Sequence, residues 1–180
     1  MPDIHVRTAR LNEAGIILQL VRESMSSYCR DSGIPETYIE ATSEPLEKVE
    51  EAISSGVVFV ALNESEEIIG TCRLYIRPRR DLDEELSKAA GSLSTRIAYF
   101  ARFAVWDSWR SRGIGNYLLS FCERIARITS CSHILLHTAL SNEGMVSYYK
   151  AHGFSLLSSE ESRGYIRGLF GKRLSFFPRQ

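Results

Sequence analysis

Hydrophobic and polar positions recur with two different periods in the first 76 residues. A short alternating stretch at residues 4–7 predicts a strand, and residues 8–25 carry apolar side chains three and four positions apart, which is the spacing of one helix face. The apolar positions of that helix are Ile16, Ile17, Leu20 and Val21. Residues 42–56 repeat the helical spacing behind a capping residue and an early proline, and stop at a glycine. Two apolar runs, 57–62 and 67–76, flank a polar linker and predict a β-hairpin.

The next stretch is charged rather than periodic. Residues 77–95 are interrupted by a proline and a glycine, so we predict a loop with a short helix at 82–90. Residues 96–106 then alternate and are rich in aromatic side chains, which predicts a strand. One face of that strand is expected to carry Tyr99, Ala101, Phe103 and Val105.

Helical spacing returns after Gly113 and predicts a long helix. Its buried stripe is expected to consist of Ile114, Leu118, Phe121, Ile125 and Ile128. Residues 133–139 predict a further strand, and residues 141–153 predict a capped helix that stops at a glycine. Residues 154–160 and 172–177 are predicted to pair as a terminal hairpin around a turn that contains glycines.

Composition places this pattern in a globular protein. At 180 residues, with 44% hydrophobic and 24% charged residues, the chain suits a single domain, which we predict to span residues 1–180. Its 22 basic and 22 acidic residues balance, so no overall field attracts nucleic acid or an anionic membrane, and we expect neither as a partner. The first ten residues lack the apolar core of a signal peptide, and no segment reaches the roughly 20 apolar residues that span a bilayer. We therefore expect a cytoplasmic protein.

The cysteines are scattered and form no C-x-x-C pair. They are Cys29, Cys72, Cys122 and Cys131. In a cytosolic chain this arrangement favours free thiols over disulfides. One grouping has the residue types of a metal site and consists of Cys122, Cys131, His133 and His137. Its spacing matches no common zinc module, and the cysteines and histidines fall in different predicted elements, so we expect buried thiols and no metal.

The junction between the strand at 96–106 and the following helix has a distinctive composition. Two arginines, Arg110 and Arg112, are followed closely by two glycines, Gly113 and Gly115. The first N–H groups of a helix lack intrahelical acceptors, and glycines let a bulky ligand approach them. Such a helix start can bind an anion, with the arginines adding charge, and the same glycines can also serve a tight turn alone. The junction is not a dinucleotide fingerprint, because no G-x-G-x-x-G is present, and no segment has the Walker spacing.

These elements, in this order, resemble the GNAT superfamily of N-acetyltransferases over most of the chain. The specific part is Val105 followed by Arg110, Gly113 and Gly115, which fits the family's Arg/Gln-x-x-Gly-x-Gly/Ala signature after a strand. Downstream residues stand where the family often has Asn, a small or apolar residue, Tyr, Gly and Phe; they are Asn142, Met145, Tyr149, Gly153 and Phe154. The resemblance implies an α/β (α+β) fold with a central mixed, mostly antiparallel twisted sheet of six to seven strands, flanked by about four helices.

The resemblance also implies acetyl-coenzyme A as co-substrate. In such proteins the pyrophosphate lies against backbone N–H groups of the turn, here residues 111–116, and the pantetheine arm runs along the strand that ends at Val105. A backbone N–H in 103–105 would polarise the thioester carbonyl, and Asn142 would contact the arm from a neighbouring helix. The predicted cofactor-binding residues are Phe103, Ala104, Val105, Arg110, Ser111, Arg112, Gly113, Ile114, Gly115, Asn116 and Asn142.

The reaction so implied is attack of a neutral amine on the thioester, which needs a base for the ammonium and an acid for the departing thiolate. Tyr149 is the predicted acid, because a phenol donates at neutral pH and the family spacing selects it over Tyr148. The base is where the chain departs from the family, since many relatives place a glutamate where this chain has Tyr99. His137, a carboxylate from residues 81–85 and a chain of water molecules all stay open as the base.

Two other functions stay open. A non-catalytic acyl-coenzyme A sensor is consistent with the missing glutamate. An acyltransferase that takes a longer acyl chain from a carrier protein, as the distantly similar acyl-homoserine lactone synthases do, is consistent with the aromatic strand and the arginines at 77–80. Those arginines suit a solvated loop, balanced by the acidic residues at 81–85, better than a binding patch. The amine acceptor and the formation of a homodimer are left open.

Overall fold

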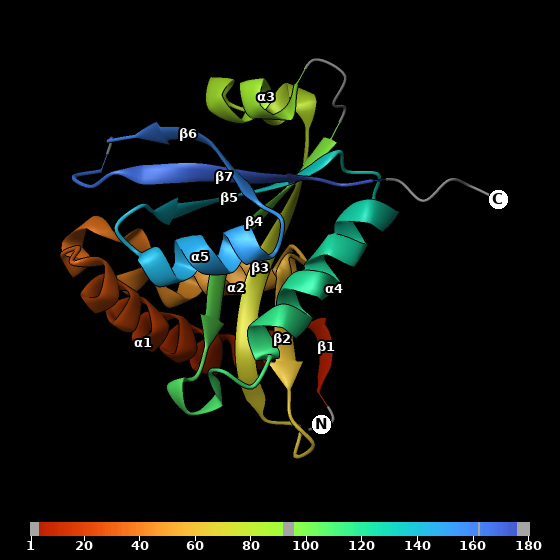
Figure 1. The fold of residues 1–180 in the computed structure, drawn as a ribbon. Helices are drawn as coiled ribbons and strands as arrows, with labels where there is room; N and C mark the ends of the chain where they lie inside the picture. The colour runs from red at the N-terminus through yellow and green to blue at the C-terminus, as the bar shows by residue number, and fades with distance from the viewer. Residues whose placement is uncertain (1–3, 92–95, 162, 176–180) are drawn as a thin grey trace. The chain divides into compact units, whose positions relative to one another are not determined.

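The structure is a computed structural model that describes residues 4–91, 96–161 and 163–175. These residues form seven β-strands and five α-helices (Figure 1). Contacts within the chain gather into two compact units. Unit 1 comprises Met1–Leu74 and Ala101–Phe121, and unit 2 comprises Tyr75–Phe100 and Cys122–Gln180. Three elements have residues in both units: β3 (Ile68–Pro78), β4 (Arg96–Val105) and α4 (Ile114–Ile128).

The strands of unit 1 include an antiparallel meander. β1 (His5–Thr8), β2 (Val58–Leu62) and the first part of β3 lie next to one another in that order, with His5 opposite Leu62. β2 is buried along its whole length and has a neighbouring strand on each side. The predicted first strand and the predicted hairpin are both confirmed.

Two helices belong to unit 1, α1 (Ala14–Ser32) and α2 (Leu46–Ser54). Both were predicted, although α1 starts behind a 3-10 turn at Leu11–Glu13. Ile16 has the helical spacing of the apolar positions, but its side chain is 41% exposed. Neighbouring positions on a helix point about 100° apart, so Ile16 points away from the core when Ile17 faces it. The buried apolar residues on that face are Ile17, Leu20 and Val21.

Unit 2 holds the remaining strands. The first part of β4 pairs in parallel with β5 (His133–Ala139), and β5 pairs antiparallel with β7 (Arg167–Arg173). β7 in turn pairs antiparallel with β6 (Ser155–Glu160), so β7 lies between β5 and β6 (Figure 1). With one parallel pair among antiparallel pairs, the described strands confirm the predicted mixed, mostly antiparallel architecture.

The terminal hairpin exists, but the prediction placed its second strand too late. The strand begins at Arg167 rather than at residue 172, and Phe176 and Phe177 lie outside the described residues. Gly168 and Gly171 belong to the strand and not to the turn. A Cβ atom at either position would come within 2.6 or 2.5 Å of a leucine side chain, so both positions require glycine for close packing.

The short helix predicted at 82–90 is confirmed as α3 (Glu84–Ala90), one of the five α-helices that the described residues form. α4 has the predicted bounds, but the stripe prediction is wrong for Ile128, which is 70% exposed at the last position. The fully buried apolar residues of α4 are Ile114, Leu118, Leu119, Cys122 and Ala126. No helix in the described ranges is both long enough and apolar enough to cross a bilayer.

Candidate functional site

The turn between β4 and α4 lies in unit 1 and contains the residues predicted to bind an anion. After a 3-10 turn at Asp107–Trp109, Ser111 and Gly113 have left-handed backbones, with φ of +60° and +83°. Gly113 adopts this conformation without the penalty that a side chain would bring. The Tyr117 N–H donates to the Gly113 carbonyl at 3.1 Å and closes the first turn of α4. The N–H groups of residues 114–116 therefore form the helix start, where donors have no intrahelical acceptor.

Two arginines lie beside this turn. The Arg110 guanidinium is 2.9 Å from the Asp107 carboxylate, and the Arg112 guanidinium lies 5.0 Å from the centre of the Trp109 ring. Arg112 and Trp109 also line a surface hollow together with residues 63–65 from the connection between β2 and β3. Both guanidinium groups thus have a partner within the turn that precedes α4, and positive charge near a helix start favours an anionic ligand.

The end of β4 is fixed to β3 and α1 within unit 1. The backbone N–H of Trp106 donates to the Ile69 carbonyl at 3.2 Å, and its indole N–H donates to the Ile68 carbonyl at 2.9 Å. The Val105 carbonyl accepts a hydrogen bond of 3.2 Å from the Ser24 hydroxyl of α1. The end of the backbone predicted to contact the thioester, residues 103–105, is therefore attached to two elements of the same unit, β3 and α1.

Close packing at Gly70 brings α4 against β3. A Cβ atom on Gly70 would lie 3.0 Å from Leu118 Cδ1, 3.1 Å from Ile114 Cγ2 and 3.3 Å from the Ala104 carbonyl oxygen. A side chain at this position would be crowded by α4 and by the end of β4, so glycine suits the close approach of α4 to β3. The sequence pattern alone does not reveal this role of Gly70.

Asn142 and Tyr149, the other two predicted site residues, lie in unit 2 on α5 (Glu143–Ala151). The Asn142 Oδ1 atom accepts from the Met145 N–H at 3.0 Å, so Asn142 is the N-cap of this helix. Tyr149 is 5% exposed, and its ring contacts Phe154 edge to face with a centroid distance of 5.7 Å. Both residues thus have a structural role, and their roles toward coenzyme A stay predictions.

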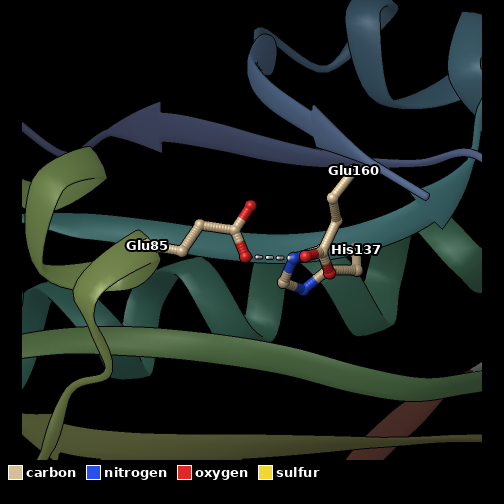
Figure 2. A group of neighbouring side chains, drawn as sticks. All are labelled: Glu85, His137 and Glu160. Atoms are coloured by element: carbon tan, nitrogen blue, oxygen red, sulfur yellow. Dashed lines mark hydrogen bonds and ion pairs between the residues drawn. The ribbon is translucent and has the colours of Figure 1, made fainter. Parts of the chain in front are cut away.

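Unit 2 also joins two of the three groups left open as the base. The Tyr99 hydroxyl is 2.8 Å from His137 Nδ1, and His137 Nε2 is 3.2 Å from Glu85 Oε2. The Ser158 hydroxyl donates to the other oxygen of Glu85 at 2.7 Å. Figure 2 shows Glu85 and Glu160 directing their carboxylates toward the His137 ring.

The environment of His137 keeps its imidazole neutral at pH 7. Burial lowers the pKa of His137 below its ordinary value of 6.5, and the positive charge of Arg167 lowers it further. The carboxylates of Glu85 and Glu160 act in the opposite direction without reversing the shift. Arg167 itself donates to Glu160 at 2.5 Å, so the cation that lowers the pKa of His137 is paired with one of the two carboxylates.

The metal-type grouping suggested by the sequence is not the one that the structure brings together. Cys122 and Cys131 are buried free thiols, as predicted. Among the described residues, the group whose potential ligand atoms all lie within 4.8 Å of one another consists of Glu85, His137 and Glu160. His137 is the one member that this group shares with the grouping suggested by the sequence, and Glu160 could not be predicted because no local spacing links a residue on β6 to Glu85 and His137.

The arginines at 77–80 do not form one patch. The Arg77 guanidinium lies over the rings of Tyr75 and Tyr99 at 5.6 and 5.9 Å, whereas Arg80 is largely exposed and lies 3.6 Å from the neighbouring Asp81. Arg79 donates to the Gly91 carbonyl. Separate partners of this kind agree better with a loop that is balanced locally than with a shared anion site.

Much of this chain resembles known proteins in sequence. The model of the acetyltransferase (GNAT) family matches residues 19–154. The chain is 36% identical over 67 residues to the chloroplastic GCN5-related N-acetyltransferase 4 of Arabidopsis thaliana. That match covers 37% of this chain and 23% of the relative, so the chain matches only about a quarter of that protein's length.

Solved structures of similar fold extend over nearly the whole chain. The PaiA N-acetyltransferase of Thermoplasma acidophilum, in complex with coenzyme A, superposes with a TM-score of 0.73 at 19% identity and covers 95% of this chain and 99% of that one. NAA60 of Arabidopsis thaliana, in complex with a bisubstrate analogue, superposes with a TM-score of 0.75 at 18% identity and covers 95% and 98%. At these identities the likeness establishes the fold.

Proposed function

We propose that this chain, which belongs to the acetyltransferase (GNAT) family, transfers an acetyl group from acetyl-coenzyme A to a primary amine. A cytoplasmic location is part of the same proposal. The nitrogen attacks the thioester carbon, the C–N bond forms, and the C–S bond breaks to release coenzyme A.

The observation that carries the proposal is the turn from β4 to α4. Its helix start presents the N–H groups of residues 114–116, Gly113 has a left-handed backbone, and Arg110 and Arg112 stand beside it. This set of groups suits a pyrophosphate, which needs several donors and positive charge within a small volume. Gly115, the second residue of α4, leaves room for such a ligand close to the backbone.

The remaining predicted contacts complete the proposal. A backbone N–H within 103–105 would polarise the thioester carbonyl, and Asn142 would contact the pantetheine arm. Tyr149 would give its hydroxyl proton to the sulfur as the thiolate leaves. Its burial among aromatic rings fits a group whose orientation must be fixed, and the same burial fits a purely packing role, so this assignment needs its own test.

The first experiment measures binding of acetyl-coenzyme A by calorimetry and by the shift in melting temperature. We expect a dissociation constant in the micromolar range, or about 8 kcal/mol of binding free energy. Gly115→Val should abolish binding while the protein stays folded, because the valine fills the space that the ligand needs. The matched control is Gly15→Val, at the second position of α1, where a Cβ meets nothing within 4 Å. No heat and no melting shift with the parent protein at millimolar ligand would refute the proposal.

The second experiment measures acetyl transfer to a panel of amines: polyamines, amino acids, an aminoglycoside and peptides with a free N-terminus. Transfer to any of them is the expected result. Binding without transfer to any amine indicates the acyl-coenzyme A sensor instead. Transfer only from an acylated carrier protein, with none from acetyl-coenzyme A, indicates the carrier-dependent acyltransferase.

A further inference from the structure

A hydroxyl, an imidazole and a carboxylate are linked in series within unit 2. They belong to Tyr99 on β4, His137 on β5 and Glu85 on α3, with distances of 2.8 Å and 3.2 Å between successive partners. We propose that this series accepts the proton that the acceptor ammonium must lose before it attacks the thioester. The inference rests on the proposed acetyltransferase function and assigns its base.

Strand register explains why the three groups meet. β4 and β5 are parallel with Tyr99 opposite Leu135, so Tyr99 and Leu135 point to the same face of the sheet. His137, two residues after Leu135, points to that face as well. α3 covers the same face through Leu86 and Ala90, and the residue before Leu86 is Glu85. The apolar contact of α3 with β4 and β5 therefore places the Glu85 carboxylate next to the His137 imidazole.

The order of the groups matches what proton transfer needs. The Ser158 hydroxyl holds Glu85 Oε1, which leaves Oε2 toward His137 Nε2. With Nε2–H donating to Glu85, the Nδ1 atom accepts from the Tyr99 hydroxyl. Tyr99 is half-buried rather than enclosed. A hydroxyl activated by an imidazole that a carboxylate orients is a recurring solution in catalysis.

The protons balance as follows. An ammonium N–H passes its proton to the Tyr99 oxygen, while the hydroxyl proton of Tyr99 moves to His137 Nδ1. The imidazolium so formed lies between the carboxylates of Glu85 and Glu160 and later releases its proton to solvent. The nitrogen loses a second proton to solvent after it attacks, and this balances the proton that the leaving sulfur takes up.

The charges around His137 suit an imidazole that is neutral before proton transfer and positively charged for a short time after it. Glu85 faces it from α3, Tyr99 from β4, Glu160 from β6 and Arg167 from β7. Burial and Arg167 lower the pKa of His137, whereas the two carboxylates raise it. The lone pair of the neutral imidazole is therefore available at pH 7, and the carboxylates stabilise the charge that arrives with the proton.

A divalent metal ion is the competing occupant of this group, because the potential ligand atoms of Glu85, His137 and Glu160 lie within 4.8 Å of one another. Two contacts favour the proton. Arg167 already neutralises Glu160, and a guanidinium this close opposes a dication. His137 Nε2 and Glu85 Oε2 are also at the distance of a direct hydrogen bond.

The test compares kcat/KM across pH 5 to 10 for the parent and three variants, with acetyl-coenzyme A and the best amine of the panel. In the parent, kcat/KM should fall as the pH drops through the lowered pKa of His137. His137→Gln and Tyr99→Phe should lose about 100- to 10,000-fold in kcat/KM at pH 7, with unchanged affinity for coenzyme A. His137→Gln should also lose the acidic limb of the profile.

Glu85→Gln provides a variant that keeps the imidazole. Because the Glu85 carboxylate raises the pKa of His137, its removal should move the acidic limb to lower pH and reduce the rate, which a purely structural role of Glu85 would not do. The matched control is His133→Gln on the same strand, a histidine whose pKa burial also lowers and which is hydrogen-bonded to Ser132. It should keep the parent profile.

Three results would overturn the inference. His137→Gln with the kcat/KM and pH profile of the parent would show that another group takes the proton. Equal losses in His133→Gln and His137→Gln would show an effect on the strand and not on proton transfer. Activity of the parent that is lost with a chelator and restored by zinc would show that the group binds a metal. In all three cases the parent transfers acetyl, so the proposed function survives, whereas a parent that acetylates no amine refutes the proposed function itself.

Discussion

Replacing Glu44 with glutamine should strongly destabilise unit 1. The Glu44 carboxylate receives two hydrogen bonds from Arg73, of 3.0 and 2.7 Å, and two from Arg102, of 3.3 and 3.1 Å. The side chains of Glu44 and Arg73 are only 6% and 5% exposed. Glu44→Gln keeps the shape and removes the charge, which leaves the Arg73 guanidinium buried without its counterion.

The expected size follows from that burial. Breaking a buried ion pair by removing one partner costs about 3 to 5 kcal/mol, because the remaining charge stays away from water. For a chain of this length, 1 kcal/mol corresponds to about 2 to 4 °C in melting temperature, so the variant should melt roughly 6 to 20 °C below the parent. Glu51→Gln, which removes an exposed carboxylate from the pair with Lys48, is the control and should melt close to the parent.

The pH dependence gives a second measurement on the same variant. Burial raises the pKa of Glu44, but the hydrogen bonds from Arg73 and the charges of Arg102 and Arg73 outweigh it, so the folded-state pKa lies below the ordinary value of 4.5. The contribution of Glu44 is therefore complete above its unfolded pKa and disappears as the pH falls through the folded one. Thermal or denaturant unfolding at pH 7, 5 and 3 should show the difference between parent and variant narrowing toward acid. A variant as stable as Glu51→Gln at pH 7 would refute the reasoning.

Two further predictions concern α5 and the contact between β3 and α4. Tyr149→Phe should lower turnover about ten- to a thousandfold with little change in coenzyme A affinity, and Tyr148→Phe should keep the turnover of the parent. Equal turnover in Tyr149→Phe and the parent would show that the ring serves packing. A selective loss in Tyr148→Phe would assign the acid to Tyr148. Gly70→Val should reduce the free energy of unfolding by about 1 to 3 kcal/mol in denaturant titrations, because the valine side chain overlaps neighbouring atoms. The control is Gly15→Val, where a Cβ meets nothing within 4 Å. Equal free energies of unfolding for the two variants would contradict the packing argument.

Local signals in the sequence predicted most elements correctly. Asn142 and Gly153 delimit α5 because a cap and a left-handed stop act within a few residues of the helix they bound. The junction at Arg110 and Gly113 was recognisable for the same reason, since a strand end, a turn and a helix start are contiguous. The failures are at positions whose environment comes from distant parts of the chain.

Glycines show the difference clearly. Gly113 and Gly153 have left-handed backbones, which is what a glycine usually indicates. Gly168 and Gly171 have ordinary strand positions, and glycine is needed there because leucines from other segments approach their Cα atoms. A single sequence does not distinguish these two reasons, and the prediction therefore extended the terminal turn into β7.

Polar side chains that pair across long stretches of sequence could not be predicted for the same reason. Glu85 and His137 are 52 positions apart, and Glu44 and Arg102 are 58 apart. Each pair forms only because strands and helices that carry them meet in the fold. The sequence could name His137 and the acidic stretch 81–85 as candidates on chemical grounds, but it could not link them to each other or to Tyr99.

The double attachment of Trp106 to β3 has a thermodynamic consequence for ligand binding. Its backbone and indole N–H groups both bond to carbonyls of Ile68 and Ile69, directly before the turn that leads to α4. A loop anchored in this way is already ordered in the folded protein, so its backbone N–H groups are in position before an anion binds. The ordering entropy that usually weakens recognition of a phosphate by a flexible loop is then small. Binding at this turn should accordingly depend on desolvation and charge rather than on rearrangement of the backbone.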